Sequence, residues 1–123
     1  MSDPPSEAWD FRIRAAEIED ESHRRPGASW VPPILTDLVL AARRTPLSCY
    51  YPFTSHVTLR FATGPTWWTG DGTVLPVNIG LVPGGGYVVY TRALLEDPAV
   101  VELETAGADE AVAKAEQLAA QAS

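Results

Sequence analysis

The side chains best suited to chemistry lie together in residues 49–56, Cys-Tyr-Tyr-Pro-Phe-Thr-Ser-His, directly before an alternating run that predicts a strand. His56 carries an imidazole, which titrates near neutral pH and can act as a general acid or base. Neighbouring strand residues point to opposite faces, so Ser55 is not paired with His56 by adjacency. Thr54 and His56 share a face if the extended run begins that early. We therefore predict His56, Ser55 and Thr54 as catalytic residues; the alternative is a histidine with only a surface or hydrogen-bonding role.

Cys49 allows two interpretations. It is a nucleophile if the Pro-containing turn brings it to His56, or it is a small buried hydrophobe, as lone cysteines often are. A single cysteine rules out an internal disulfide and a cysteine-based zinc site. His23 and Glu19 have the i,i+4 spacing of two ligands, but two exposed ligands are too few for a metal ion. The glycine run 84–86 lacks the Lys and Ser/Thr of a phosphate loop, so we expect neither a metal nor another cofactor.

Aromatic side chains near this segment predict a wall against which a planar or hydrophobic ligand could lie. The adjacent indoles of Trp67 and Trp68 fall in a loop, so one is expected to cap the core and the other to line a cleft or interface. An ordinary rim of core residues would have the same composition. The predicted substrate-binding residues, which include two charged side chains that could orient a substrate, are Tyr51, Phe53, Arg60, Trp67, Trp68, Asp71 and Tyr90.

Hydrophobic periodicity predicts an α+β domain with two layers. The expected order is α-α-β-β-β-β-α, with an antiparallel sheet of about four strands packed by two to three helices. Pro32-Pro33 is expected to open the second helix. Pro76 cannot donate to a ladder, so its strand is expected at an edge of the sheet. The expected elements are helices at 6–24 and 30–45, strands near 57–61, 73–79, 87–90 and 101–104, and a last helix from about residue 107.

The chain is expected to form one domain over residues 1–123, with 1–27 as an N-terminal helix and 28–123 as the α+β core. The first helix is apolar on two sides, so it is either sandwiched or in contact with a partner. In the first case it covers the core and leaves one aromatic exposed. In the second it is an interface arm for a homodimer. The two apolar sides are Trp9, Ile13 and Ala16, and Phe11, Ala15 and Ile18, while Glu17, Glu19, Asp20 and Glu21 are expected to form a solvated face.

The alternating strands give the predicted sheet one apolar and one polar face. The apolar face must meet the second and last helices. Antiparallel sheets often leave the other face in water, where Arg60 could pair with a glutamate on a neighbouring strand. If the first helix or a partner covers that face, the same side chains form a buried polar cleft. The residues expected on it are His56, Thr58, Arg60, Asn78, Glu102 and Glu104.

The net charge of −7 argues against nucleic acid as a partner, because a phosphate-tracking surface needs a basic stripe. No apolar run approaches the roughly 20 residues that span a bilayer, so no membrane contact is expected. The N-terminus lacks the basic and apolar regions of a secretory signal. With a lone thiol that suits a reducing compartment, these features predict a cytoplasmic protein.

Residues 51–61, Tyr-Pro-Phe-Thr-Ser-His-Val-Thr-Leu-Arg-Phe, are followed by Gly-Pro-Thr-Trp at 64–67 and by an Ala- and Val-containing helix from Gly107. Together they resemble a family of small actinobacterial natural-product biosynthesis proteins whose activity is unknown. The resemblance covers roughly residues 47–121 and implies a secondary-metabolite context, but no mechanism and no catalytic residues.

Two main hypotheses follow. The chain is an accessory protein or cofactor-free enzyme that binds a hydrophobic intermediate or a precursor peptide at an aromatic and histidine cleft. An enzyme of this kind would catalyse a proton-transfer reaction such as cyclisation, isomerisation or dehydration. Alternatively it is a non-catalytic dimeric interaction or adaptor module. A third, weaker reading is an immunity-like protein whose acidic surface neutralises a basic partner.

Overall fold

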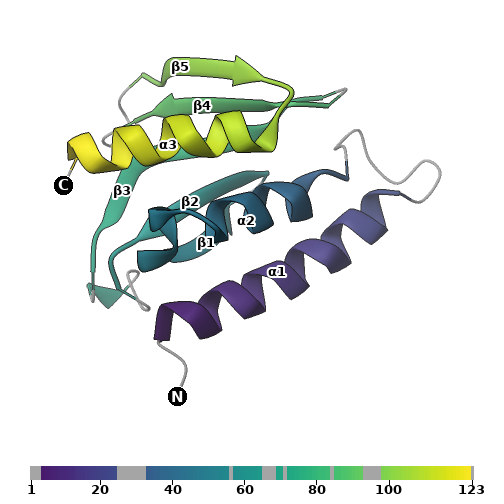
Figure 1. Ribbon diagram of the computed structural model, residues 1–123, viewed down its shortest axis with the longest axis horizontal. Helices are drawn as coiled ribbons and strands as arrows, with labels where there is room; N and C mark the ends of the chain where they lie inside the picture. Colours follow the sequence, from purple (N-terminus) through teal and green to yellow (C-terminus); the bar gives the residue numbers. More distant parts are fainter. Residues whose placement is uncertain are drawn as a thin grey trace.

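Three α-helices form one layer against a single antiparallel sheet in the computed structural model, which describes residues 4–24, 33–55, 57–64, 69–70, 72–83, 85–92 and 98–122 (Figure 1). The sheet is a meander in which each strand pairs with its neighbours in sequence, in the order β1-β2-β3-β4-β5. The elements are α1 (Pro4–His23), α2 (Leu35–Arg43), the 3-10 helix η1 (Pro46–Cys49), β1 (Tyr51–Ser55), β2 (Thr58–Ala62), β3 (Val74–Leu81), β4 (Tyr87–Thr91), β5 (Val100–Thr105) and α3 (Ala108–Ala122).

The predicted α+β class and the order of the three helices are confirmed, and the sheet has one strand more than the four expected. The additional strand is β1, where the sequence suggested a turn because of Pro52. Proline is tolerated on an edge strand, which needs hydrogen bonds on one side only. β1 is such an edge, and it pairs in regular register with β2 from Tyr51↔Ala62 to Ser55↔Thr58.

The prediction that Pro76 marks an edge strand is wrong, because β3 lies at the centre of the sheet. The Pro76 carbonyl accepts a hydrogen bond from the backbone N–H of Arg92, one residue beyond the end of β4. The missing donor therefore affects only the last rung of the β3–β4 ladder. On the other side a bulge between Arg60 and Ala62 interrupts the β2–β3 register, so no regular β2 partner faces Pro76.

The core lies between the helices and the inner face of the sheet. α3 packs across β3, β4 and β5, and α2 packs between α3 and α1. Trp9 of α1 reaches the same core, with its ring centroid 6.3 Å from that of Phe61 and its indole N–H donating to the Tyr50 carbonyl at 2.9 Å. The side chains that this packing buries completely include Trp9, Leu38, Val39, Leu59, Phe61, Val77, Ile79, Val89 and Ala115.

α2 begins at Leu35, two residues after Pro33, rather than at the prolines themselves. Its own N-cap residue, Ile34, offers no side-chain hydrogen bond. The missing acceptor comes from Asp20, whose two carboxylate oxygens accept from the backbone N–H groups of Leu35 (3.1 Å) and Thr36 (2.8 Å). Asp20 is only 2% exposed, so its expected place on a solvated acidic face is wrong.

α1 covers one edge of the core and leaves a second apolar side in solvent. Phe11 and Ile18 are 66% and 67% exposed, while Trp9 and Ala16 are buried. α1 is tied to α2 by an ion pair between Asp10 and Arg43 and by a hydrogen bond from Arg43 to the Ser6 hydroxyl. None of the helices in the described ranges has the length and apolar character needed to cross a membrane.

Candidate functional site

The helices lie on one face of the sheet only, so no helix among the described residues covers the opposite face, called here the outer face (Figure 1). Contacts place α1 on the inner side as well: Trp9 packs on Phe61, and Arg12 donates to the Thr54 hydroxyl at 3.0 Å. Strand pairing aligns one residue from each strand across the outer face. This outer row consists of Phe53, Arg60, Asn78, Tyr90 and Val101.

Arg60 and Phe53 form the charged part of the outer row. The guanidinium carbon of Arg60 lies 5.8 Å from the centroid of the Phe53 ring, a cation–π arrangement. The Nε atom of Arg60 is buried and has no hydrogen-bond partner. Within the described ranges no carboxylate forms an ion pair with Arg60, so the expected cross-strand pair with a glutamate is not formed there. Among the described residues, an aromatic ring and not an acid lies against the guanidinium.

Asn78 occupies the middle of the outer row and is only 2% exposed, although it lies on the uncovered face. Its amide NH₂ donates to the carbonyls of Pro76 (3.3 Å) and Tyr90 (3.5 Å). These bonds hold the amide against the sheet. The side chains of Arg60 and Tyr90, on the two neighbouring strands, therefore flank a short and fixed polar group.

Gly80 adjoins the outer row, where it adds no side chain above the sheet. A Cβ at this position would meet the Val88 Cγ1 atom at 3.3 Å and the Tyr90 Cε1 atom at 3.7 Å. The Tyr90 ring thus lies within van der Waals contact of a Cβ at this position, while the tight contact would be with Val88. Arg92 continues the alternation of β4 on the side of Tyr90, and its Nε is also buried without a hydrogen-bond partner.

The structure brings together three of the predicted binding residues, Phe53, Arg60 and Tyr90, with Asn78, which was expected on the same polar face, and adds Arg92, which the sequence analysis had not singled out. Tyr51 lies on the same face as Phe53, two residues away, and pairs with Ala62. The remaining predicted binding residues, Trp67, Trp68 and Asp71, lie outside the described residues.

The predicted catalytic residues are divided between the two faces. Thr54 pairs with the buried Leu59 and accepts the hydrogen bond from Arg12, so it belongs to the inner face. Ser55 is exposed and pairs with Thr58 on the outer face. His56 lies outside the described residues. In the described part of the chain, no group of three or more His, Cys, Asp or Glu side chains could hold a metal ion.

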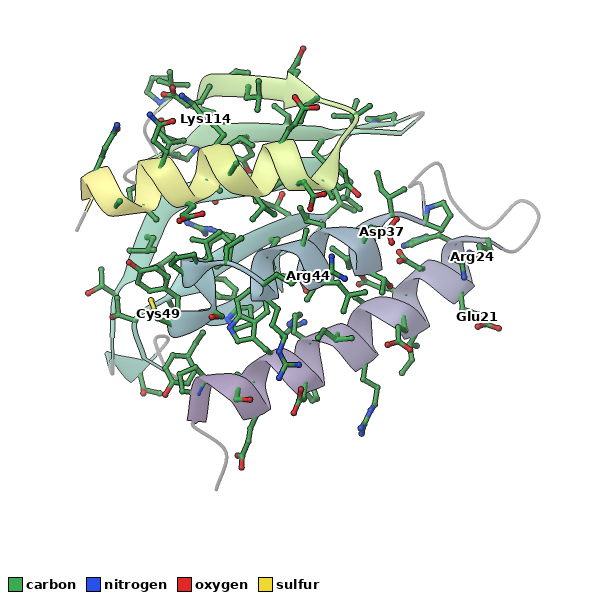
Figure 2. All side chains as sticks on the ribbon, in the orientation of Figure 1. Glu21, Arg24, Asp37, Arg44, Cys49 and Lys114 are labelled. Atoms are coloured by element: carbon green, nitrogen blue, oxygen red, sulfur yellow. The ribbon has the colours of Figure 1, made fainter. Side chains whose placement is uncertain are left out.

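Cys49 lies at the end of η1 and is exposed, so the interpretation of a small buried hydrophobe is wrong (Figure 2). The thiol lines a cavity of about 670 Å³ between η1 and the N-terminal half of α1. The predicted pair with His56 needed a turn after residue 50, whereas residues 51–55 form an extended strand. The cavity is lined by Pro5, Ser6, Trp9, Arg43, Pro46, Ser48 and Cys49.

Comparisons with other proteins do not assign this chain to a protein family. No protein-family model matches the chain, and neither a curated protein nor a solved structure matches it. The predicted resemblance to an actinobacterial natural-product family therefore stays a prediction, and the functional argument depends on the outer row.

Proposed function

We propose that this protein is a small binding module that holds a flat, anionic and partly apolar molecule on the outer row. The observation that carries the proposal is the Arg60 guanidinium, stacked at 5.8 Å on Phe53 without an ion-pair partner among the described residues. A planar guanidinium offers a fork of N–H donors that matches a carboxylate. With its Nε atom buried, the terminal nitrogens remain to bind a ligand.

The neighbours of Arg60 support a flat ligand. Phe53 and Tyr90 supply ring surfaces at two places in the row, and Asn78 between them is fixed by its own hydrogen bonds. Aromatic surfaces with a few fixed polar groups are typical of small-molecule sites. An acidic protein with a net charge of −7 repels anions at long range, so the two arginines on the outer face, Arg60 and Arg92, favour this face for them.

Within the predicted context of natural-product biosynthesis, the ligand is a carboxylate-bearing aromatic intermediate or a precursor peptide with acidic and aromatic residues. The protein would then be a cytoplasmic accessory protein that carries or presents this molecule. The predicted acid–base reaction of His56 is a further part of this hypothesis and does not contribute to binding by the outer row. Binding and turnover are therefore separable: replacing His56 would abolish turnover and leave binding intact.

A titration with 2-naphthoate, followed by two-dimensional amide NMR, tests the proposal. 2-Naphthol, which has the same rings without the carboxylate, and acetate, which has the carboxylate without the rings, are the matched probes. We expect 2-naphthoate to shift the amide signals of Phe53, Arg60, Asn78 and Tyr90, and each partial probe to bind at least about tenfold more weakly, since a charge-assisted pair and an aromatic contact are each worth about this factor.

Two variants of equal charge complete the test. Arg60→Gln should weaken 2-naphthoate binding about tenfold. Arg44→Gln removes the same charge from an exposed residue after α2 in the helix layer and should change nothing (Figure 2). The proposal fails if the two variants bind alike, or if the shifted amides cluster around the Cys49 cavity.

A further inference from the structure

The exposed side of α1 repeats with the spacing of a coiled-coil seam. Apolar and small side chains occur at alternating intervals of three and four residues, which is the a and d pattern of a heptad. Phe11 and Ile18 occupy d positions and are about two-thirds exposed. Ala8, Ala15 and Ser22 occupy the a positions between and beside them. This stripe, called here the α1 seam, lies opposite the side of α1 that carries Trp9, Ala16 and Asp20 into the core.

Charged residues flank the α1 seam in an order that suits a second copy. In a parallel pair of helices, a residue at position g faces the e residue five places further along the partner. Here Glu7 and Arg14 are the g residues, and Arg12 and Glu19 are the e residues. A parallel second copy therefore pairs Glu7 with Arg12 and Arg14 with Glu19, and symmetry makes each pair twice.

The opposite orientation is less favourable. In an antiparallel pair of full overlap, e faces e and g faces g, which sets Arg12 against Arg12, Arg14 against Arg14 and Glu7 against Glu21. If the two antiparallel helices are shifted by one heptad, these residues of like charge no longer face each other. This shift also shortens the overlap to roughly residues 10–23 and places Phe11 against Ser22 instead of another apolar side chain.

We propose that the α1 seam is the interface of a parallel homodimer, with Phe11 and Ile18 packed on their counterparts and the Glu7–Arg12 and Arg14–Glu19 pairs fixing the direction. Two heptads are short for an isolated coiled coil, because a free helix of this length is marginal. Here α1 is already held in place by Trp9, Asp20 and the Asp10–Arg43 pair, so association does not have to order it. The outer row lies on another face of the molecule, so this proposal does not rest on the proposed function.

Arg12 fits this arrangement. One of its terminal nitrogens donates to Thr54, while its Nε is buried without a hydrogen-bond partner. Burial lowers the pKa of Arg12, and the nearby Glu19 carboxylate offsets this only in part. A second carboxylate, from Glu7 of the other copy, would compensate the charge that remains.

Light scattering coupled to gel filtration, at a series of protein concentrations, measures the proposed association. We expect a mass that rises from 13.3 kDa toward twice that value. Phe11→Asp should keep the chain monomeric throughout, because the exposed side chain can change without loss of the fold. Val100→Asp, an equal change at an exposed position of β5 outside the outer row, should leave the association intact. A wild-type chain that stays at 13.3 kDa overturns the proposal.

A charge exchange determines the orientation. Arg14→Glu should weaken association about tenfold, and Arg14→Glu with Glu19→Arg should restore it, since the parallel pair is rebuilt with reversed signs. In the shifted antiparallel pair, Arg14 faces Glu21 and Arg12 faces Glu19, so the same double variant would weaken binding further. Restoration by Arg14→Glu with Glu21→Arg instead would replace the parallel arrangement by the antiparallel one.

A cross-link provides a second, independent readout. In a Cys49→Ser background, Ala8→Cys places one thiol near the start of the seam. A parallel dimer brings the two thiols together, and mild oxidation should yield a covalent dimer in high proportion. An antiparallel dimer holds them at opposite ends of the interface, and the absence of a cross-link in a chain that still associates would contradict the proposed direction.

Discussion

The carboxylate of Asp20 near the end of α1 caps the first turn of α2 by accepting hydrogen bonds from Leu35 and Thr36. A helix N-terminus leaves several backbone N–H groups unpaired, and a nearby side chain in the sequence usually satisfies one of them. Here the acceptor is 15 residues away in sequence from Leu35 and is buried together with Leu35. The start of α2 therefore depends on α1 being in place.

Replacing Asp20 tests this dependence. We expect Asp20→Ala to lower the free energy of unfolding by about 2–4 kcal/mol, because it leaves one buried and one partly buried N–H group without an acceptor. Asp20→Asn retains one acceptor oxygen and should cost less. Urea denaturation followed by circular dichroism measures both. Glu21→Gln changes the exposed neighbour on the same helix (Figure 2) and should stay within about 0.5 kcal/mol; an equal loss there would argue against a specific cap.

Tyr87 connects the same turn to the sheet and predicts a pH dependence. Its hydroxyl donates to the Ile34 carbonyl at 2.9 Å. Burial raises the pKa of Tyr87 from 10.0 to about 12, and the negative charges of Asp37 and Asp20 contribute in the same direction. Because the folded pKa is the higher one, this stabilisation is complete below pH 10 and is lost as the pH rises toward 12.

The comparison with Tyr87→Phe isolates that effect. At pH 8 the variant should be less stable by about 1 kcal/mol, since the Ile34 carbonyl loses its donor. Between pH 10 and 12 the difference should shrink, because only the wild type has a phenol to ionise. Thermal unfolding of both proteins at pH 8 and at several values between pH 10 and 12 measures this difference in stability. A difference that stays constant up to pH 12 would show that the Tyr87 hydroxyl does not titrate in this range.

Gly72 is predicted to be indispensable in the connection between β2 and β3. Its φ is +121°, and a Cβ there would lie 2.5 Å from the Gly64 backbone nitrogen. Backbone atoms cannot move aside as a flexible side chain can, so Gly72→Ala should cost about 2–4 kcal/mol. Gly70→Ala is the matched control, since Gly70 also has a positive φ (+91°) but open space around it. Equal losses in the two variants would attribute the effect to φ alone.

Trp9 is predicted to contribute most of the free energy that holds α1 on the core. Trp9→Ala should reduce the free energy of unfolding by about 3–5 kcal/mol, the range for a deleted core aromatic. Trp9→Phe keeps much of the volume and loses the hydrogen bond to Tyr50, so it should cost roughly 1–2 kcal/mol. Chemical denaturation gives both values, with Glu17→Ala on the exposed side of the same helix as the reference. A small loss in Trp9→Ala would mean that α1 is held by its other contacts.

Periodicity was sufficient to predict the class and the main elements, because most of them alternate or repeat cleanly. It failed where one residue type has two structural uses. Pro52 is as typical of a turn as of an edge strand, and the difference depends on whether a neighbour lies on both sides. Asp20 stands in a run of acidic residues. Its burial results from a tertiary contact, the hydrogen bond from the Leu35 N–H group, which the local sequence does not predict.

The candidate site was predictable in part for the same reason. Alternation placed Arg60 and Asn78 on one face of the sheet. The addition of Phe53 and Tyr90 to the same row depends on strand order and register, which the pattern of a single strand does not contain. The outer row thus depends on the pairing between strands, whereas the α1 seam can be predicted from the sequence of one helix alone.

The meander topology has a consequence for how quickly the chain folds. Strands that follow one another also pair with one another, so the contacts within the sheet are local in sequence, and proteins with local contacts fold fast. The helices are the exceptions, since Trp9 meets Tyr50 across 41 residues, Arg12 meets Thr54 across 42 and Tyr87 meets Ile34 across 53. We expect the sheet to assemble first and α1 to dock afterwards, so that the slowest kinetic step is the one that buries Trp9 and Asp20.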